Sequence, residues 1–469
     1  MTMRCSALLL ALLFPFCGIA QSITARLEKA YAVFENDTQV KHATISLLLV
    51  NAKNGQVLFA RNPSVGMAPA STQKIVTAAT ALGMLGETFS YPTVLSYDGQ
   101  IQKGVLKGNL YITGSGDPTL GSWRYPGSTD TAVVKKWVSV IGAAGIKRVE
   151  GDVIAIDTVF ESQTTPGGWV WEDIGNYYGA GASGLNWHEN QYDLELAPGD
   201  KPGEPVKILG TKPALHTTRF INELSTGENG SGDNGYIYLP PYSSGGFIRG
   251  TVPAGEKKFI ISGALPLPGE TAAQALVDGL STANCIVTGH ARSATIDRVS
   301  RGHLATVTLD RHESPNLDSI IYWFLQKSIN LYGEALLKTF AWKLTGHGSA
   351  DAGIQWVQDF WIKRGIDRDE LNIKDGSGLA PQNRVTTHAQ VEVLRYAMTQ
   401  PWFAAYYTAL PVFNNMKMKS GSIGDVKGFC GYQNLPDGTG CVFSFLVNNF
   451  SGSSKLLVDK MYKVLDVLK

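Results

Sequence analysis

The sequence predicts a multidomain α+β protein in which both ends of the chain build one antiparallel sheet flanked by helices. Residues 44–62 contain two β-rich arms around an Asn-Gly pair, which is the strongest short-range signal of a hairpin. Strand-like runs return at residues 415–450 and are natural partners for that hairpin. Between them, short strands alternate with Gly/Pro turns over residues 89–297. We therefore expect one domain built from both ends of the chain, with the middle inserted.

The length of the chain supports this division. At 469 residues it exceeds what a single hydrophobic core usually serves, so two or three domains are expected. Part of the insertion is especially rich in Gly, Pro and Ser, which indicates a small β-rich unit with long surface loops. The expected boundaries are 1–20 for a leader, 22–88 and 298–469 for the main domain, 89–196 and 267–297 for a second domain, and 197–266 for a third.

Helices are expected mainly in the main domain. Residues 22–37 have a helical pattern, and residues 71–86 predict a buried helix because their apolar residues recur at helical spacing. Those apolar residues are Ile75, Ala78, Ala79 and Leu82. Further amphipathic runs predict helices at 316–344, 352–365, 389–398 and 453–468, and, within the insertion, at 131–145 and 271–283.

Composition and charge exclude some classes of function. Hydrophobic residues make up 44% of the chain and charged residues 17%, which is typical of a globular protein. Lys and Arg number 41 against 40 Asp and Glu, and no basic cluster is present that would grip phosphates. We therefore expect no nucleic-acid partner. No Cys/His spacing resembles a zinc site, so no metal is implied.

The N-terminus has the pattern of a secretory signal peptide. Arg4 precedes the apolar run 7–20, which ends in small residues and is too short for a good membrane span. We expect cleavage near Ala20 and export to the periplasm. No later segment contains the roughly 18 uninterrupted apolar residues that a spanning helix needs, so no transmembrane segment is expected after removal of the leader.

Three cysteines remain after removal of the leader, namely Cys285, Cys430 and Cys441. Cys430 and Cys441 flank a Pro-Asp-Gly turn, which predicts that they lie on adjacent strands. In an exported protein such a pair can be oxidised to a disulfide. The alternative is two buried thiols in a sheet, and the sequence leaves both open.

The first motif with chemical meaning is the S-x-x-K formed by Ser71 and Lys74. At this spacing the two side chains share one face of a helix, so the lysine amine can reach the serine hydroxyl. Serine is a poor nucleophile alone, and a lysine desolvated beside a second cation can act as its neutral base. The alternative is a serine that caps the helix beside a lysine whose stem packs along it.

The second motif, Ser328-Ile329-Asn330, lies at the junction of two apolar-periodic runs. This place would present both polar side chains to a cleft, where Ser328 would relay a proton and Asn330 would bind a substrate amide. A similar triplet at 314–316 has proline after its serine and is interpreted as a helix start.

The third motif, Lys419-Ser420-Gly421, lies in a β-like run. A strand at a cleft edge offers a cation and a hydroxyl for a carboxylate, and backbone N–H groups for a peptide added along the edge. Gly421 permits close approach of that ligand. The alternative is a polar strand end that runs into a turn.

The order S-x-x-K, S-x-N and K-[S/T]-G is the set known from β-lactamases and penicillin-binding proteins. The chain resembles the D-alanyl-D-alanine carboxypeptidase/endopeptidase family, the class C low-molecular-mass penicillin-binding proteins. Four further stretches carry this resemblance, at 114–120, 168–190, 327–339 and 375–386. It implies a penicillin-binding-protein/β-lactamase-like transpeptidase core, with an antiparallel sheet between helical clusters and two inserted domains rich in β structure.

The resemblance also implies a mechanism. Ser71 would attack the carbonyl of the D-Ala-D-Ala bond in a peptidoglycan stem peptide, and Lys74 would accept its proton. Ser328 and Lys419 would pass a proton to the leaving D-alanine. Water would then release the acyl-enzyme, and penicillins would acylate the same serine because they mimic the peptide.

Substrate binding is implied for further residues. Lys419 with Ser420 would hold the terminal carboxylate, and the backbone N–H groups of Ser71 and Ser422 would form the oxyanion hole. Asp173 aligns best with an acidic residue that recognises the amino group of the stem-peptide diamino acid. Its neighbour Glu172 is the alternative, as is a purely structural carboxylate.

Two departures from the family pattern bear on rates and antibiotic sensitivity. Ile329 stands where relatives often have Asp, and Ser420 replaces the commoner Thr. Both departures keep the hydroxyl or amide groups that the chemistry uses. Asp375 and Ser377, in the stretch DGSGL, are expected to shape the cleft wall rather than to react.

The sequence is consistent with three functions. The leading one is an exported serine DD-peptidase, a carboxypeptidase, an endopeptidase or both. A β-lactamase or D-amino-acid esterase would use the same scaffold with efficient deacylation. A non-catalytic peptidoglycan-binding or sensor protein would keep only the cleft. None of these needs a metal or an organic cofactor.

Overall fold

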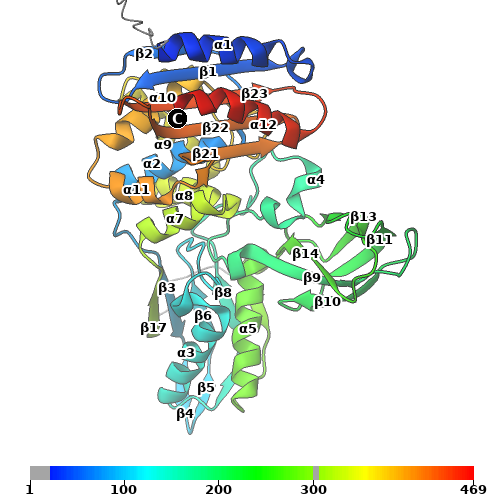
Figure 1. Ribbon diagram of the computed structural model, residues 1–469. Helices are drawn as coiled ribbons and strands as arrows, with labels where there is room; N and C mark the ends of the chain where they lie inside the picture. Colours follow the sequence, from blue (N-terminus) through cyan, green and yellow to red (C-terminus); the bar gives the residue numbers. More distant parts are fainter. Residues whose placement is uncertain (1–21, 299–305) are drawn as a thin grey trace, which may run out of the picture.

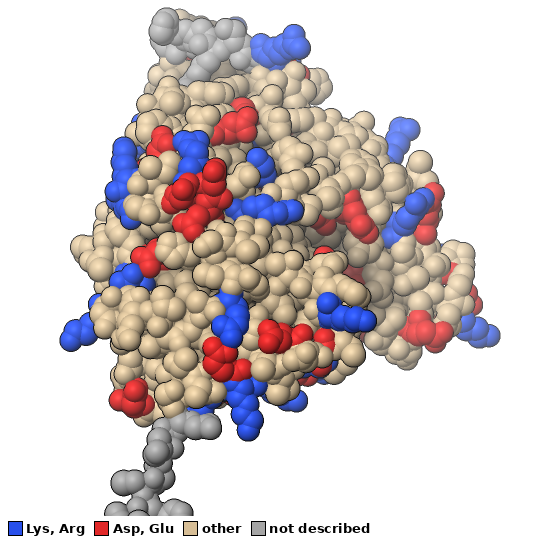
Figure 2. Space-filling view, turned by 90° about the horizontal axis from the view of Figure 1, so that it is seen from above, with Lys and Arg blue, Asp and Glu red and all other residues tan. Residues whose placement is uncertain are grey.

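The computed structural model describes residues 22–298 and 306–469 (Figure 1). The expected signal peptide, residues 1–20, lies outside the described residues. Among the helices of the described part, none is both long and apolar enough to span a membrane. Lys/Arg and Asp/Glu side chains are interspersed on the face seen in Figure 2, without a continuous patch of one sign.

The central sheet has six strands in the order β2-β1-β23-β22-β21-β20. Strands β1 and β23 pair antiparallel over their whole length, with Thr44 opposite Asn448. The two ends of the chain therefore meet in one sheet, as the sequence predicts (Figure 1). The strands are β1 Thr44–Asn51, β2 Val57–Arg61, β20 Val412–Phe413, β21 Met416–Ile423, β22 Val426–Asn434 and β23 Gly440–Asn448.

Helices cover both faces of this sheet, because its central strands are apolar on both sides. Along β1, Leu47 and Leu49 belong to one core and Leu48 and Val50 to the other, as the two-residue period of a strand requires. One face carries α1 Ile23–Glu35 and α12 Ser454–Leu465 (Figure 1). The other face carries α2 Lys74–Leu85, α7 Leu317–Gln326, α8 Asn330–Thr345, α9 Ala350–Ile362, α10 Thr387–Met398 and α11 Phe403–Ala409.

The chain is interrupted between α7 and α8, where the sequence places the junction of two apolar runs. Ser328 has a φ of 58°, in the left-handed region that non-glycine residues rarely adopt. This conformation ends α7 and starts α8 in a new direction, so Asn330 becomes the first residue of α8.

The inserted segment begins with a five-stranded sheet in the order β16-β8-β6-β3-β17 and a four-stranded sheet in the order β15-β7-β5-β4. The core beside them contains Trp137 of α3 and Leu276 of α5. The elements are β3 Pro92–Tyr97, β4 Gln100–Gln102, β5 Val105–Lys107, β6 Leu110–Thr113, α3 Asp130–Ala143, β7 Arg148–Glu150, β8 Val153–Ile156, α5 Pro268–Thr282, β15 Ile286–Val287, β16 Ala291–Ser293, α6 Ala294–Asp297 and β17 Val307–Glu313.

A second part of the insertion consists of two three-stranded sheets, β10-β9-β14 and β11-β13-β12, which share one small core. The short helix α4 Trp171–Ile174 contacts β12. The strands are β9 Gln191–Ala197, β10 Lys207–Lys212, β11 Arg219–Gly227, β12 Asn234–Tyr238, β13 Gly245–Pro253 and β14 Phe259–Ala264. A last two-stranded sheet joins β18 Leu371–Asn372 to β19 Arg384–Val385.

The domain boundaries expected from the sequence remain a proposal, and strand pairing favours two adjustments to them. Strand β17 pairs with β3 of the insertion, which favours a return to the main domain after Glu313 rather than at residue 298. Strand β9 pairs with β10 and β14, which favours a start of the small β-rich unit at Gln191 rather than at residue 197.

The sheet register decides the state of the cysteines. Cys430 lies opposite Ser444, whereas Cys441 lies opposite Gln433. Cys441 points to the same face of the sheet as its partner Gln433. Gln433 is three residues after Cys430 on β22, and side chains alternate between faces along a strand, so the two thiols belong to opposite faces and to different cores. All three cysteines of the described part are free and buried. Of the two alternatives that the sequence leaves open, the Cys430–Cys441 disulfide is therefore excluded, and the buried thiols are correct.

We expect a reducing agent to leave the midpoint temperature of thermal unfolding unchanged, because no disulfide constrains the unfolded chain. The measurement compares melting curves of the mature protein with and without dithiothreitol. Thiol titration of the denatured, unreduced protein is the control. It should find Cys285, Cys430 and Cys441 reactive, and a fall of several degrees on reduction would contradict the expectation.

Candidate active site

Ser71 lies in a single 3-10 turn, Ala70–Gln73, that leads directly into α2. Neither this turn nor α2 has a side-chain cap at its N-terminus, so Ser71 does not act as the capping residue that the sequence left as an alternative. Its hydroxyl instead contacts Lys74, the first residue of α2. Ala70 is fully buried with a φ of 47°, which turns the chain into the nucleophile position.

The Lys74 amine is buried and makes three polar contacts. Its Nζ lies 2.9 Å from Ser71 Oγ, 2.7 Å from Asn330 Oδ1 and 2.7 Å from the Ser377 carbonyl oxygen. A neutral amine has two N–H groups and one lone pair. The two carbonyl oxygens accept the two N–H groups, so the lone pair points toward the Ser71 hydroxyl.

The surroundings favour this neutral form. Burial lowers the pKa of Lys74 well below 10.5, and the positive charge of Lys419 lowers it further. The carboxyl groups of Asp375 and Glu334 act in the opposite direction but do not outweigh burial. The arrangement therefore places a serine hydroxyl beside an amine whose pKa is lowered, the direction that general-base activation requires.

Asn330 is held on both sides of its amide group. Its Oδ1 accepts from Lys74, and its Nδ2 donates 2.8 Å to the Tyr178 carbonyl oxygen of the inserted segment. The side chain thus orients the Lys74 amine, and its contact with a substrate amide stays a prediction. Ser328 lines the same cleft, and no hydrogen bond of its hydroxyl occurs among the described residues.

The third motif lies on β21, next to the turn that carries Ser71. Lys419 is buried, its Nζ donates 2.8 Å to the Ser420 carbonyl oxygen, and burial lowers its pKa to about 8. A Cβ on Gly421 would lie 2.6 Å from the Pro69 carbonyl oxygen and 3.0 Å from the Ser71 nitrogen. Gly421 is therefore required for the close packing of β21 against the turn Ala70–Gln73. This turn carries the predicted nucleophile Ser71 and is called the nucleophile turn below.

The stretch DGSGL forms the wall behind Lys74. Asp375 is fully buried, and five donors saturate its carboxylate. These donors are Gln73 Nε2, Trp169 Nε1, the Gly378 and Ala380 backbone N–H groups, and Asn383 Nδ2. Because Gln73 precedes the base and Trp169 comes from the insertion, Asp375 ties the nucleophile turn to the inserted segment.

Sequence reasoning missed Glu334, which lies one helical turn after Asn330 and is buried. Its carboxyl group accepts from the Gly376 N–H at 3.0 Å. Burial and the nearby Asp375 charge raise the Glu334 pKa to about 8. The i, i+4 spacing from Asn330 was the available signal, since it places both side chains on the face of α8 that meets Lys74.

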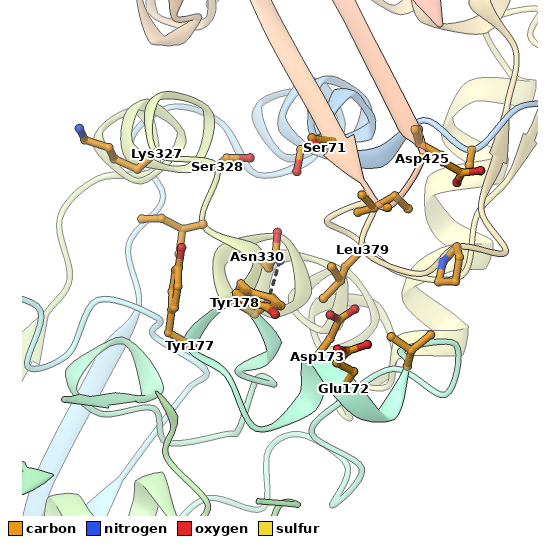
Figure 3. A pocket seen from close by; sticks show the side chains of 18 of the residues that line it. Ser71, Glu172, Asp173, Tyr177, Tyr178, Lys327, Ser328, Asn330, Leu379 and Asp425 are labelled. Carbon is orange, nitrogen blue, oxygen red and sulfur yellow. Dashed lines mark hydrogen bonds between the residues drawn. The ribbon is translucent and has the colours of Figure 1, made fainter. Parts of the chain in front are cut away.

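Residues of the first two motifs line a cleft of about 890 Å³ (Figure 3), whereas Lys419, Ser420 and Gly421 of the third are not among its lining residues. Five of the predicted site residues line it, and Lys74 and Lys419 lie buried behind its wall. The lining residues of that set are Ser71, Asp173, Ser328, Asn330 and Ser422. Glu172 lines the cleft beside Asp173, and partial burial together with the Glu172 charge raises the Asp173 pKa to about 6. Within the ranges 22–298 and 306–469 no cluster of side chains could hold a metal ion.

Comparison with known proteins identifies the family. The model of the D-Ala-D-Ala carboxypeptidase 3 (S13) family matches residues 27–466. The chain belongs to this family. The match confirms the resemblance expected from the sequence and, with it, the enzyme class of a serine-type D-Ala-D-Ala carboxypeptidase. This S13 peptidase is 27% identical over 473 residues to a D-alanyl-D-alanine carboxypeptidase of Actinomadura sp. (strain R39), covering 94% of this chain and 85% of the relative.

Solved structures confirm the fold class. Penicillin-binding protein 4 of Haemophilus influenzae superposes with a TM-score of 0.78 at 21% identity, covering 94% of this chain and 98% of the other. The same protein in complex with a β-lactam superposes with a TM-score of 0.73 at 20% identity, covering 96% and 100%. The S13 peptidase therefore has the α+β fold of penicillin-binding protein 4, with several sheets in addition to the central one.

We expect Gly421→Ala to lower carboxypeptidase activity on a D-Ala-D-Ala peptide by on the order of 100-fold, because the added methyl group displaces backbone atoms of the nucleophile turn. The measurement is kcat/KM for D-alanine release. Gly440→Ala in β23 is the control, since a Cβ there meets no atom closer than 3.6 Å. Equal activity of the two variants would contradict the expected role of Gly421.

Proposed function

We propose that this S13 peptidase is an exported enzyme that cleaves D-Ala-D-Ala or cross-link peptide bonds in peptidoglycan stem peptides through a Ser71 acyl-enzyme, and that penicillin acylates the same serine. The observation that carries the proposal is the placement of the Lys74 amine between two carbonyl oxygens and the Ser71 hydroxyl. The β-lactam complex of the Haemophilus influenzae protein, which has the same fold, supports the penicillin part of the proposal.

In the proposed acylation step, the Lys74 lone pair accepts the Ser71 proton while Oγ attacks the substrate carbonyl carbon. The backbone N–H groups of Ser71 and Ser422 stabilise the resulting oxyanion, a contribution worth about 3–4 kcal/mol per donor in other serine hydrolases. The close packing of β21 on the nucleophile turn, made through Gly421, supports this pairing of N–H groups.

In the proposed departure of D-alanine, Lys419 and Ser420 bind its carboxylate, and Ser328 passes the proton from Lys74 to the leaving nitrogen. Ser328 lines the cleft with Ser71, which supports a relay between them. A water molecule then attacks the acyl-enzyme carbonyl carbon while Lys74 accepts its proton, the bond from that carbon to Ser71 Oγ breaks, and Lys74 returns the proton to Oγ. Asp173, on the cleft wall formed by α4, contacts the amino group of the diamino acid in this proposal.

A fluorescent penicillin tests the nucleophile and its base. Wild-type protein should form a stable covalent label, and Ser71→Ala should form none. Lys74→Ala should be labelled about 10²- to 10⁴-fold more slowly, because it lacks the general base. The measurement is the rate of label incorporation followed on a denaturing gel.

Two results would contradict the assignment. Labelling of Lys74→Ala at the wild-type rate would remove Lys74 as the base. Fast release of hydrolysed drug would favour the β-lactamase alternative, whereas folded wild-type protein that takes no label and releases no product would favour a non-catalytic binding protein.

The pH dependence of peptide cleavage tests the role of Lys419. Its pKa of about 8 means that the cation is present below this pH and is lost above it. We therefore expect kcat/KM for D-Ala-D-Ala peptides to fall as the pH rises through about 8, since the carboxylate loses its partner. Lys419→Arg keeps its charge at that pH, so the fall of kcat/KM at alkaline pH (the alkaline limb of the profile) should move to a higher pH. An alkaline limb that stays in place in Lys419→Arg would contradict this role.

A further inference from the structure

Arg124 lines the cleft together with Ser71 and Asn330, although it belongs to the inserted segment. Its side chain is 19% exposed. The proposed mechanism gives this arginine no role. An arginine on the wall of a peptide-binding cleft is a candidate for recognition of an anionic substrate group, because its guanidinium group matches a carboxylate in shape and charge.

One edge of the Arg124 guanidinium group is held by a buried carboxylate. Its Nε lies 2.9 Å and 3.2 Å from the two carboxylate oxygens of Glu189, whose side chain is 0% exposed. Glu189 also accepts from Ser122 Oγ at 2.7 Å and from Tyr332 OH at 2.9 Å. Three donors thus share the Glu189 charge, and the Arg124 side chain is oriented in advance of any ligand.

The rest of the guanidinium group is placed by aromatic rings. Its Cζ lies 5.3 Å from the ring centroid of Trp123 and 5.3 Å from that of Trp323, within the range of cation–π contacts. Within the part of the chain that the structure describes, no hydrogen bond occupies Nη1 or Nη2 of Arg124. Two parallel N–H donors therefore remain for a ligand in the cleft.

The backbone around Glu189 is strained, which indicates that its position matters. His188, Glu189 and Asn190 have φ values of 53°, 51° and 50°, three consecutive non-glycine residues in the left-handed region. The Asn190 side chain holds this segment through the Trp187 N–H and the Gly181 carbonyl oxygen. Strain of this kind persists only where surrounding contacts enforce it, and it concentrates at ligand sites.

We propose that Arg124 forms a second carboxylate-binding subsite, which receives a carboxylate on the acyl part of the peptide substrate. The subsite rests on the proposed function and is separate from the place of the terminal carboxylate at Lys419 and Ser420. Arg124 lies against Trp323 of α7 and belongs to the insertion, whereas Lys419 lies on β21. Lys327, which follows α7, also lines the cleft (Figure 3) and adds a positive charge to it.

A matched pair of substrates tests the subsite. We use N-acyl-D-Ala-D-Ala peptides whose acyl chain ends either in a carboxylate or in the corresponding carboxamide, across a series of chain lengths. Wild-type protein should prefer the best carboxylate peptide over its carboxamide by about 10- to 100-fold in kcat/KM, the usual range for a charge-assisted contact. Arg124→Gln should lose this preference, and Arg124→Lys should keep part of it.

Two further variants make the result specific. Arg124→Gln leaves the Glu189 charge buried without its partner, so the double variant Arg124→Gln/Glu189→Gln removes both charges and is used if the single variant does not fold. Arg384 also lines the cleft, and Arg384→Gln is the control that removes one positive charge elsewhere in it. This control should retain the preference for the carboxylate peptide.

The outcomes separate the subsite from the proposed function. Equal kcat/KM for the two peptides in wild-type protein would overturn the subsite, as would an unchanged preference in Arg124→Gln or in the double variant. An equal loss of preference in Arg384→Gln would show a general charge effect and would also overturn it. Penicillin labelling is measured in parallel. If folded wild-type protein neither takes label nor releases D-alanine, the proposed function fails instead.

Discussion

Burial of the Lys74 amine is the constraint on which the rest of this site depends. Its three polar contacts come from Ser71, from Asn330 at the start of α8, and from the Ser377 carbonyl oxygen. Asn330 and Ser377 lie 256 and 303 residues from Lys74 in sequence. A lysine removed from water must either lose its proton or find an anion, and here burial outweighs the nearby carboxyl groups. The fold thus lowers the pKa of the Lys74 amine, in the direction that its proposed role as a base needs.

This constraint explains the polar groups packed behind the base. Asp375 is saturated by five donors, and Glu334 accepts from the backbone of the same loop. Gly333 and Gly376 allow α8 and that loop to approach closely, since a Cβ on Gly376 would collide with the Gly333 carbonyl oxygen. In a low-dielectric interior hydrogen bonds to a buried carboxyl group are strong, so these contacts fix the loop against α8 and the turn before Lys74.

The inserted segment contacts residues of the candidate active site, or their neighbours on α8, at three places. Trp169 donates to Asp375, the Tyr178 carbonyl oxygen accepts from Asn330, and Glu189 accepts from Tyr332, two residues after Asn330 on α8. Residues that hold the first turn of α8 and the loop behind Lys74 therefore lie outside the core formed by the two ends of the chain. This arrangement gives the insertion a direct influence on the site, beyond restricting access to the cleft.

The sequence by itself determined the class of fold, the pairing of the two chain ends in one antiparallel sheet and the three motifs, because hydrophobic periodicity, an Asn-Gly turn and short residue patterns are local properties. Only the tertiary structure decided which face of the sheet each strand residue occupies, so it alone separated Cys430 from Cys441. It also decided the contacts of Glu334, Arg124 and Glu189, whose partners lie far away in sequence and follow no local pattern. Long-range packing sets burial and pairing, and these determine which charged side chains take part in the site.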